Sequence, residues 1–261
     1  MIIGKFYNGS GLGNMLHRYI ATRVRALDLG VDYRMIYIDD GAGKEQGFKG
    51  KFFLNQPNII PVDDHELQVK IYSKLLKSWD EKKVRDANGV DISPFDPEFF
   101  FIEDNTIIDG EMQSSAYWEH REKEVDKWLK VEPLEVPDDT CVVGFRGGEF
   151  ALYPDLFLTK EYYEEAMNLM IEKYGVKRFK VHTDDEVLAK EFFGDIPVIH
   201  NIGTNWGSMR YAKHAIIANS SFFILPRWLR NGITISPRYW GRHNTKIWSL
   251  PQNYYKRFKY I

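Results

Sequence analysis

This chain of 261 residues has only one cysteine, and it lacks long apolar runs and a clear excess of charge of either sign. Its single cysteine, Cys141, excludes an intrachain disulfide and a cysteine-based zinc site, and it fits a reducing compartment. No apolar run approaches the roughly 18 residues that a membrane span needs, and the N-terminus does not read as a secretory leader. We therefore expect a cytoplasmic protein of bacterial or viral type, without signal or anchor.

The charges are nearly balanced, with 35 basic and 37 acidic residues. This balance argues against a protein that mainly binds polyanions, so we expect no nucleic-acid partner. The C-terminal stretch YYKRFKYI (254–261) alternates aromatic and basic residues, which leaves open a peripheral contact with anionic lipid. The favoured interpretation is a tail that packs back on the first domain.

Three glycines crowd residues 9–13 of NGSGLGN, directly before helix-forming sequence. Such a turn exposes backbone N–H groups and admits a phosphate, a nucleotide or a sugar. It is not a phosphate-binding P-loop, because Gly13 is followed by Asn14 and Met15. The glycine spacing and the late position of Asp39 also fit a dinucleotide fingerprint poorly.

Apolar patterning predicts an α/β fold in two parts. A strand at MIIGKFY, a helix ending at Gly30 and a strand at YRMIYIDD form a βαβ unit, which favours a parallel sheet. HELQVKIYSKLL (65–76) reads as a further helix. The acidic, proline-containing stretch 132–139 reads as a linker, and a second α/β pattern follows it. We expect an N-terminal α/β domain over residues 1–138, with its glycine turn at 9–14, and a C-terminal domain over 139–261.

Polar residues gather after three expected strands of the second half: GFRGGE (144–149), HTDDE (182–186) and ANSSF (218–222). Open α/β sheets bind ligands at the carboxyl ends of their strands, so these segments predict a site. Each also has a simpler interpretation. Arg146 could be a surface arginine, the acids could favour the start of a helix with Thr183 and Glu186 as its capping box, and residues 219–221 could be a helix cap.

Taken in order along nearly the whole chain, five segments resemble the α-1,2-fucosyltransferases of glycosyltransferase family 11, within the wider group of GDP-fucose-dependent fucosyltransferases. They are GLGN (11–14), GEMQSSAYW (110–118), GFRGGE (144–149), VHTDDEVLAKEFF (181–193) and KHAIIANSSFF (213–223). The third segment departs from the family pattern, because Gly144 stands for a histidine, Gly147 for a second arginine and Glu149 for an aspartate. The donor motif is therefore recognisable but altered.

The resemblance implies a GT-B-like fold with two Rossmann-like domains facing a cleft, the first (1–138) on the acceptor side and the second (139–261) binding the GDP-sugar donor. It also implies inverting transfer of fucose from GDP-fucose to a sugar hydroxyl of a glycan acceptor. Arg146 would neutralise the leaving diphosphate, and Glu149 is the nearest candidate base. The donor-binding residues would be Gly11, Gly13, Asn14, Gly148, His182, Asp184, Asp185, Asn219, Ser220, Ser221 and Phe222.

No cofactor beyond the donor sugar nucleotide and no metal is expected, because arginine and helix termini can neutralise the diphosphate. The adjacent pair Asp39 and Asp40 is the rival metal site. Three alternatives stay open: a different GDP-sugar, another nucleotide, and a non-catalytic protein that binds glycans or nucleotide sugars.

Overall fold

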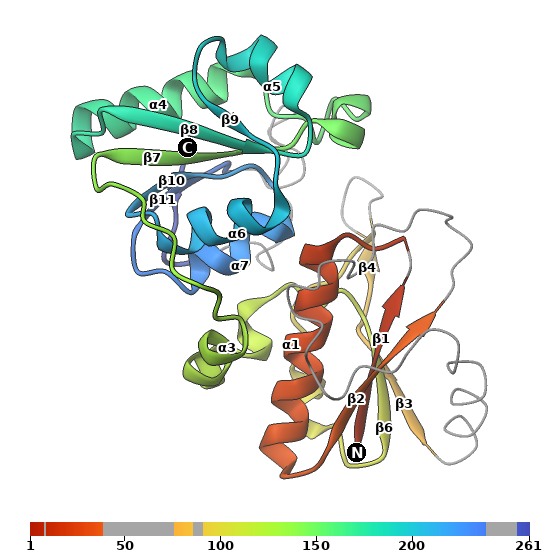
Figure 1. Cartoon of the computed structure of the whole chain (residues 1–261). Coiled ribbons are helices and arrows are strands. Elements are labelled where there is room, and N and C mark those ends of the chain that lie inside the picture. Colours follow the sequence, from red (N-terminus) through yellow and green to blue (C-terminus); the bar gives the residue numbers. More distant parts are fainter. Residues whose placement is uncertain (8, 39–75, 86–90, 239–254) are drawn as a thin grey trace. The chain divides into compact units, whose positions relative to one another are not determined.

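The structure is a computed structural model that describes residues 1–7, 9–38, 76–85, 91–238 and 255–261 (Figure 1). Contacts divide the described chain into two compact units, residues 1–130 and residues 131–238 with 255–261. The division falls at Lys130, ahead of the boundary at 138 in the sequence analysis. The stretch between the last helix of the first unit and the first strand of the second contains no helix or strand.

The first unit contains a four-stranded parallel sheet in the order β2-β1-β6-β3. Its strands are β1 (Ile2–Tyr7), β2 (Tyr33–Ile38), β3 (Lys77–Asp80) and β6 (Thr106–Asp109). Helix α1 (Leu12–Leu29) connects β1 to β2 and ends at Gly30, whose φ of 67° is left-handed. The predicted βαβ unit is therefore confirmed, with its helix stop.

Helix α1 approaches the sheet closely at Gly4 of β1. A Cβ atom at this position would lie 2.1 Å from the Thr22 hydroxyl of α1 and 2.8 Å from the Met35 methyl of β2. Since real Cβ atoms do not come so close, only glycine allows this packing of helix on sheet.

The remaining elements of the first unit are short. They are the antiparallel pair β4 (Val84–Arg85) and β5 (Asp91–Ile92), three 3-10 turns (Pro97–Phe101, Ser115–Tyr117, Glu119–Arg121) and helix α3 (Glu122–Trp128). The helix expected at 65–76 and the Asp39–Asp40 pair lie outside the described residues, apart from Leu76. Within the described ranges, no helix is long and apolar enough to cross a membrane.

The second unit contains a six-stranded parallel sheet in the order β12-β11-β10-β7-β8-β9. Its strands are β7 (Thr140–Phe145), β8 (Arg178–Thr183), β9 (Val198–Ile199), β10 (His214–Ile216), β11 (Ile233–Ser236) and β12 (Lys259–Tyr260). Strand β12 comes from the C-terminal tail. The sequence analysis expects this tail on the first domain, whereas residues 255–261 belong to the second unit, where β12 pairs with β11.

Helices cover both faces of the second sheet (Figure 1). The ring of Phe145 packs against aromatic rings of α4 (Lys160–Tyr174) and α5 (Glu186–Phe193). Its neighbour Gly144 faces α6 (Ile202–Tyr211) and α7 (Ser221–Trp228). Alternate residues of a strand point to opposite faces, so β7 is buried on both sides, as its uninterrupted apolar sequence predicts.

Two local predictions need correction. The capping box at Thr183 and Glu186 does not form, because Asp185 is the N-cap of α5 and its side chain accepts a hydrogen bond from the Leu188 N–H at 3.0 Å. Thr183 instead accepts from the Asp185 N–H at 2.9 Å. Helix α6 was not expected, since its sequence IGTNWGSMRY is rich in small and polar residues.

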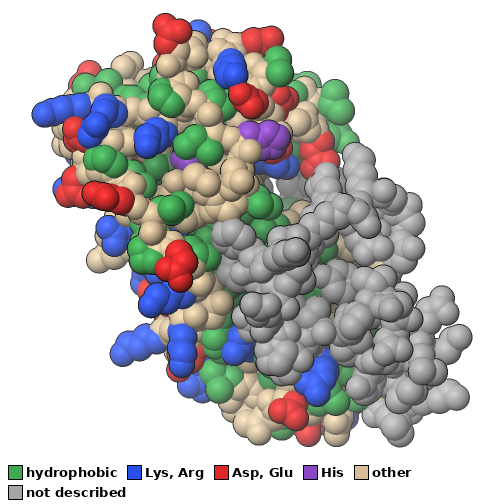
Figure 2. Space-filling view, in the orientation of Figure 1, with side chains coloured by type: hydrophobic (Ala, Val, Ile, Leu, Met, Phe, Trp, Pro, Cys, Tyr) green, Lys and Arg blue, Asp and Glu red, His purple; other side chains and the backbone are tan. Residues whose placement is uncertain are grey.

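Charges of both signs are mixed on the face of the second unit that Figure 2 shows. On the face seen in Figure 2, its basic and acidic side chains alternate without a large area of one sign. This mixture agrees with the balanced composition of 35 basic and 37 acidic residues.

Candidate functional site

The three polar segments of the second unit lie at one edge of its sheet. Strands β10, β7 and β8 are neighbours and run parallel, so their carboxyl ends meet at the same edge. Arg146 follows β7, Asp184 and Asp185 follow β8, and residues 219–221 follow β10. Strand order therefore brings together segments that the sequence separates.

Arg146 makes polar contacts with two nearby carboxylates, those of Asp184 and Glu149. Its Nη1 donates to Asp184 Oδ2 at 2.5 Å, and its Nη2 lies 3.6 Å from Glu149 Oε1, beyond hydrogen-bond distance. The guanidinium carbon lies 4.7 Å from the centre of the Phe150 ring. Arg146 Nε is buried and has no hydrogen-bond partner within the described part of the chain. The Nε/Nη2 edge, which presents two parallel N–H groups, thus makes no hydrogen bond, although Nη2 is ion-paired with Glu149.

The glycines after Arg146 are required by the two aspartates that pack against them. Asp184 Oδ1 accepts from the Gly147 N–H at 3.0 Å, and Asp185 Oδ2 accepts from the Gly148 N–H at 3.2 Å. A Cβ at Gly147 would lie 2.6 Å from the Asp185 Cβ, and Gly148 has a left-handed φ of 46°. This packing leaves no room for the second arginine that the family has at position 147.

The site carries more negative than positive charge. The Arg146 guanidinium contacts the carboxylates of Asp184 and Glu149, and a third carboxylate, that of Asp185, is bound to the Gly148 N–H two residues along the chain. A diphosphate would meet repulsion from these acids unless one of them moved away. Glu149 is the group that can do so, because it is 43% exposed and makes no hydrogen bond to Arg146.

His182 is buried rather than exposed at the sheet edge. Its Nδ1 lies 2.7 Å from Asn205 Oδ1, and Asn205 Nδ2 donates to the Thr183 carbonyl at 3.1 Å. Burial lowers the pKa of His182 to about 4, so the imidazole is neutral at pH 7. Asn205 of α6 therefore fixes the end of β8. The sequence analysis missed it because the helix that carries it was not expected.

The segment after β10 is largely buried as well. Asn219 donates to the Leu156 carbonyl at 2.9 Å, and its Oδ1 has no partner among the described residues. Ser220 stands at the N-cap position of α7, but its hydroxyl makes no capping bond. The Phe222 ring packs on the Trp206 ring with centroids 5.6 Å apart.

Gly144, which stands where the family has a histidine, is enclosed by apolar side chains. A Cβ there would lie 2.8 Å from the Phe223 ring of α7 and 2.9 Å from the Met209 methyl of α6. Phe223 thus fills the space that a side chain at position 144 would need. A larger side chain at position 144 would therefore have to displace Phe223.

We expect Gly144→His to lower the free energy of unfolding by about 1 to 3 kcal/mol, the usual cost of overpacking a core. In the double variant Gly144→His with Phe223→Ala, the space vacated by the ring accepts the imidazole, so the two effects should be strongly non-additive. Urea denaturation of the two single variants and the double variant measures this coupling. Simple additivity would show that the two side chains do not compete for the same space.

The predicted residues of the glycine turn lie in the first unit. Gly11 is the N-cap residue of α1, Gly13 and Asn14 belong to its first turn, and Asn14 Oδ1 accepts a hydrogen bond from Gln113 Nε2 at 3.1 Å. The neighbouring His17 is fully buried. Burial lowers its pKa to about 3.

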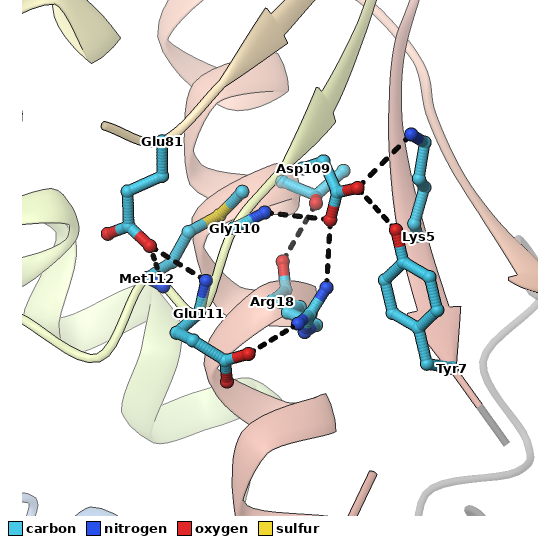
Figure 3. Close-up of polar contacts among 9 residues, drawn as sticks. Lys5, Tyr7, Arg18, Glu81, Asp109, Gly110, Glu111 and Met112 are labelled. Carbon is cyan, nitrogen blue, oxygen red and sulfur yellow. Dashed lines mark hydrogen bonds and ion pairs between the residues drawn. The ribbon is translucent and has the colours of Figure 1, made fainter. Parts of the chain in front are cut away.

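A second polar cluster in the first unit was missed by the sequence analysis. The Arg18 cluster, as we name it, consists of Lys5, Tyr7, Arg18, Asp109 and Glu111 (Figure 3). Asp109 ends strand β6 and Tyr7 ends β1, so the cluster lies at the carboxyl edge of the first sheet. The sequence signal was available, because Asp109 precedes the family-like segment 110–118.

Within the described ranges, no group of three or more His, Cys, Asp or Glu side chains could hold a metal ion. Asp39 and Asp40 lie outside those ranges.

No protein-family model and no curated protein sequence matches the chain. Solved structures do resemble it at low identity. A glycosyltransferase family 9 protein of Veillonella parvula is 11% identical with a TM-score of 0.47, over 90% of this chain and 80% of that one. The fucosyltransferase NodZ soaked with GDP-fucose is 12% identical with a TM-score of 0.45, over 88% and 92% of the two chains. POFUT1 in complex with GDP is 13% identical with a TM-score of 0.43, over 88% and 94%.

Proposed function

We propose that the protein is a GDP-sugar-dependent glycosyltransferase that moves fucose from GDP-fucose to a glycan hydroxyl with inversion, in the manner of an α-1,2-fucosyltransferase. The Nε/Nη2 edge of Arg146, which makes no hydrogen bond and lies at the carboxyl edge of a parallel sheet, carries this proposal. The ordered resemblance of five segments to glycosyltransferase family 11 supports it.

Arg146 is the group best suited to the chemistry. As the glycosidic bond breaks, negative charge grows on the leaving diphosphate while the sugar becomes cation-like. A guanidinium edge with two parallel N–H groups binds two phosphate oxygens at once, and the bond strengthens as that charge develops. Asp184 holds the other end of the guanidinium and so orients this edge.

The remaining roles are assigned by chemistry and by the resemblance. The N-terminus of α7, with Ser220 and Ser221, offers N–H groups and hydroxyls to the diphosphate. Asp184 and Asp185 would reach the nucleoside, and Glu149, once displaced from Arg146, would accept the proton of the acceptor hydroxyl. We further propose a GT-B-like arrangement of two domains and transfer without a metal.

A second candidate function is a non-catalytic binder of glycans or nucleotide sugars. It is favoured by the contacts that Arg146 already makes with Asp184 and Glu149, because a guanidinium held by the protein's own carboxylates is a weaker phosphate ligand. Release of GDP from GDP-fucose, with and without a glycan acceptor, separates the two functions.

Donor choice tests the proposal directly. At about 100 times its dissociation constant, GDP or GDP-fucose should stabilise the fold by about 2.7 kcal/mol, which corresponds to about 5 to 10 °C in Tm. UDP and UDP-sugars should leave Tm unchanged, and EDTA should leave the GDP response unchanged. Thermal denaturation measures all of these. Stabilisation by UDP-sugars but not by GDP would refute the proposal, and loss of the GDP response in EDTA would refute metal independence.

A further inference from the structure

A pocket of about 470 Å³ lies within the second unit, at the amino edge of its sheet. Its walls come from the first residues of β7 and β8 and from residues that precede β7, β8 and β9. These strands are parallel, so their amino ends lie at the edge opposite to Arg146 (Figure 1). Strand β8 is six residues long, and at about 3.3 Å per residue it separates the pocket from the site around Arg146 by about 20 Å.

Rings and one aliphatic side chain form the apolar wall of this pocket. They are Pro137, Phe179, Ile196 and Pro197. Phe179 and Ile196 are half-buried, and the two prolines are exposed but rigid, because proline fixes its own φ. The volume falls within the range of about 300 to 1,000 Å³ that small-molecule sites occupy. The wall therefore suits a small ligand with a flat, apolar body.

The rest of the pocket wall is mainly charged. Lys177, Arg178 and Lys180 lie just before and along the start of β8, and Asp195 precedes β9. Arg178 is ion-paired with Asp139, whereas neither lysine forms an ion pair with any residue that the structure describes. The Arg178 hydrogen bond and the Lys177 charge hold the pKa of Asp139 below its usual value, so this carboxylate is ionised at pH 7.

The charge of the pocket is positive even when both acids are counted. Three cations face two carboxylates, in a chain whose net charge is −2. Both lysines are exposed, so their long side chains can turn toward a ligand while their methylene groups cover its apolar part. A ligand cation would be repelled here, and an anion would be attracted.

We propose that this pocket binds a small aromatic anion, that is, a flat ring that carries a phosphate or a carboxylate group. The ring packs against Phe179 and the two prolines, and the anionic group reaches Lys177 and Lys180. Phosphate and carboxylate share the chemistry that the lysines recognise, so separate probes distinguish them. The proposal is independent of glycosyl transfer, because the pocket lies at the other edge of the sheet.

Calorimetric titration of the full chain with a matched set of naphthalene compounds tests the pocket. The anionic probes are 1-naphthyl phosphate and 1-naphthoate. The neutral and cationic matches are 1-naphthalenemethanol and 1-naphthalenemethylamine, and inorganic phosphate lacks the ring. At least one of the two anions should bind, with one ligand per chain. The other three compounds should bind about tenfold more weakly or not at all, because each lacks either the charge or the apolar contact.

Substitution of the lysines locates the site. Lys177→Met and Lys180→Met should each weaken binding of the anion about three- to fivefold, and the double variant about tenfold, as expected for losing exposed ion pairs. The matched control is Lys190→Met, which removes an exposed lysine of α5 that is paired with Glu186. This control should leave binding unchanged. Thermal denaturation of every variant should give an unchanged Tm, because all three lysines are exposed.

Three results would overturn the proposal: neither anion binds, the neutral compound binds as tightly as the anions, or the double lysine variant keeps the original affinity. A fourth control uses Arg146→Ala, in which both lysines are intact. Loss of anion binding in that variant would place the ligand at the carboxyl edge of the sheet and would equally refute the pocket. Retained binding in Arg146→Ala, together with weakened binding in the folded lysine variants, supports it.

Discussion

Arg146→Ala should lower kcat by about 10² to 10³, or about 3 to 4 kcal/mol, while donor affinity falls much less. The reason is that the guanidinium interaction strengthens as charge grows on the leaving diphosphate. Arg146→Lys should restore little activity, because an ammonium keeps the charge but lacks the Nε/Nη2 edge. Steady-state kinetics with GDP-fucose and an acceptor gives kcat and KM for both variants.

Thermal stability must be measured beside turnover, because Arg146 also bonds Asp184 across the β7 and β8 strand ends. The matched control is Arg178→Ala, which removes an exposed arginine paired with Asp139 near the start of β8. This control should keep both kcat and Tm close to the original values. Near-original turnover from a stable Arg146→Ala protein would remove Arg146 from the mechanism and favour the binding-protein function.

Arg227→Met should lower the free energy of unfolding by about 3 to 5 kcal/mol. Arg227 is fully buried, and its Nη1 donates to the carbonyls of Met209 and Ala212 at 2.9 and 2.7 Å. Its Nε donates to the Thr234 hydroxyl at 2.8 Å and its Nη2 to the Ile233 carbonyl at 3.1 Å. Methionine leaves these buried acceptors without their donor, at a cost of about 1 to 3 kcal/mol each before relaxation.

Burial lowers the pKa of Arg227 to about 9, and the nearby charges of Arg230 and Arg210 act in the same direction. The side chain still bears its proton at pH 7, so the full hydrogen-bond set is present there. Urea denaturation at pH 7 measures the loss, with Arg238→Met at an exposed site as control. Arg227 belongs to α7 and hydrogen-bonds to residues of α6 and β11 and to Ala212. Its loss should therefore also weaken the GDP binding that we propose at the N-terminus of α7. A change below 1 kcal/mol would show that water replaces these bonds.

The sequence by itself determined most of the elements that carry the Arg18 cluster and the site around Arg146. Apolar runs and helical periodicity predict β1, α1 and β2 in the first unit, and β7, β8 and β10 in the second. It also identified three polar strand ends, because local composition marks where an apolar strand stops. These are properties of neighbouring residues, which a sequence displays directly.

Tertiary structure alone decided which side chains meet. The Arg18 cluster joins residues 5, 7 and 18 with 109 and 111, and the second-unit site joins residues 146–149 with 184 and 185. His182 turned out to be a buried partner of Asn205, and Phe223 occupies the space beside Gly144. Strand order and helix packing create these contacts between residues far apart in the chain. Local periodicity does not predict these contacts. It indicates which face of a strand or helix a residue lies on, but not which residue of another element packs against it.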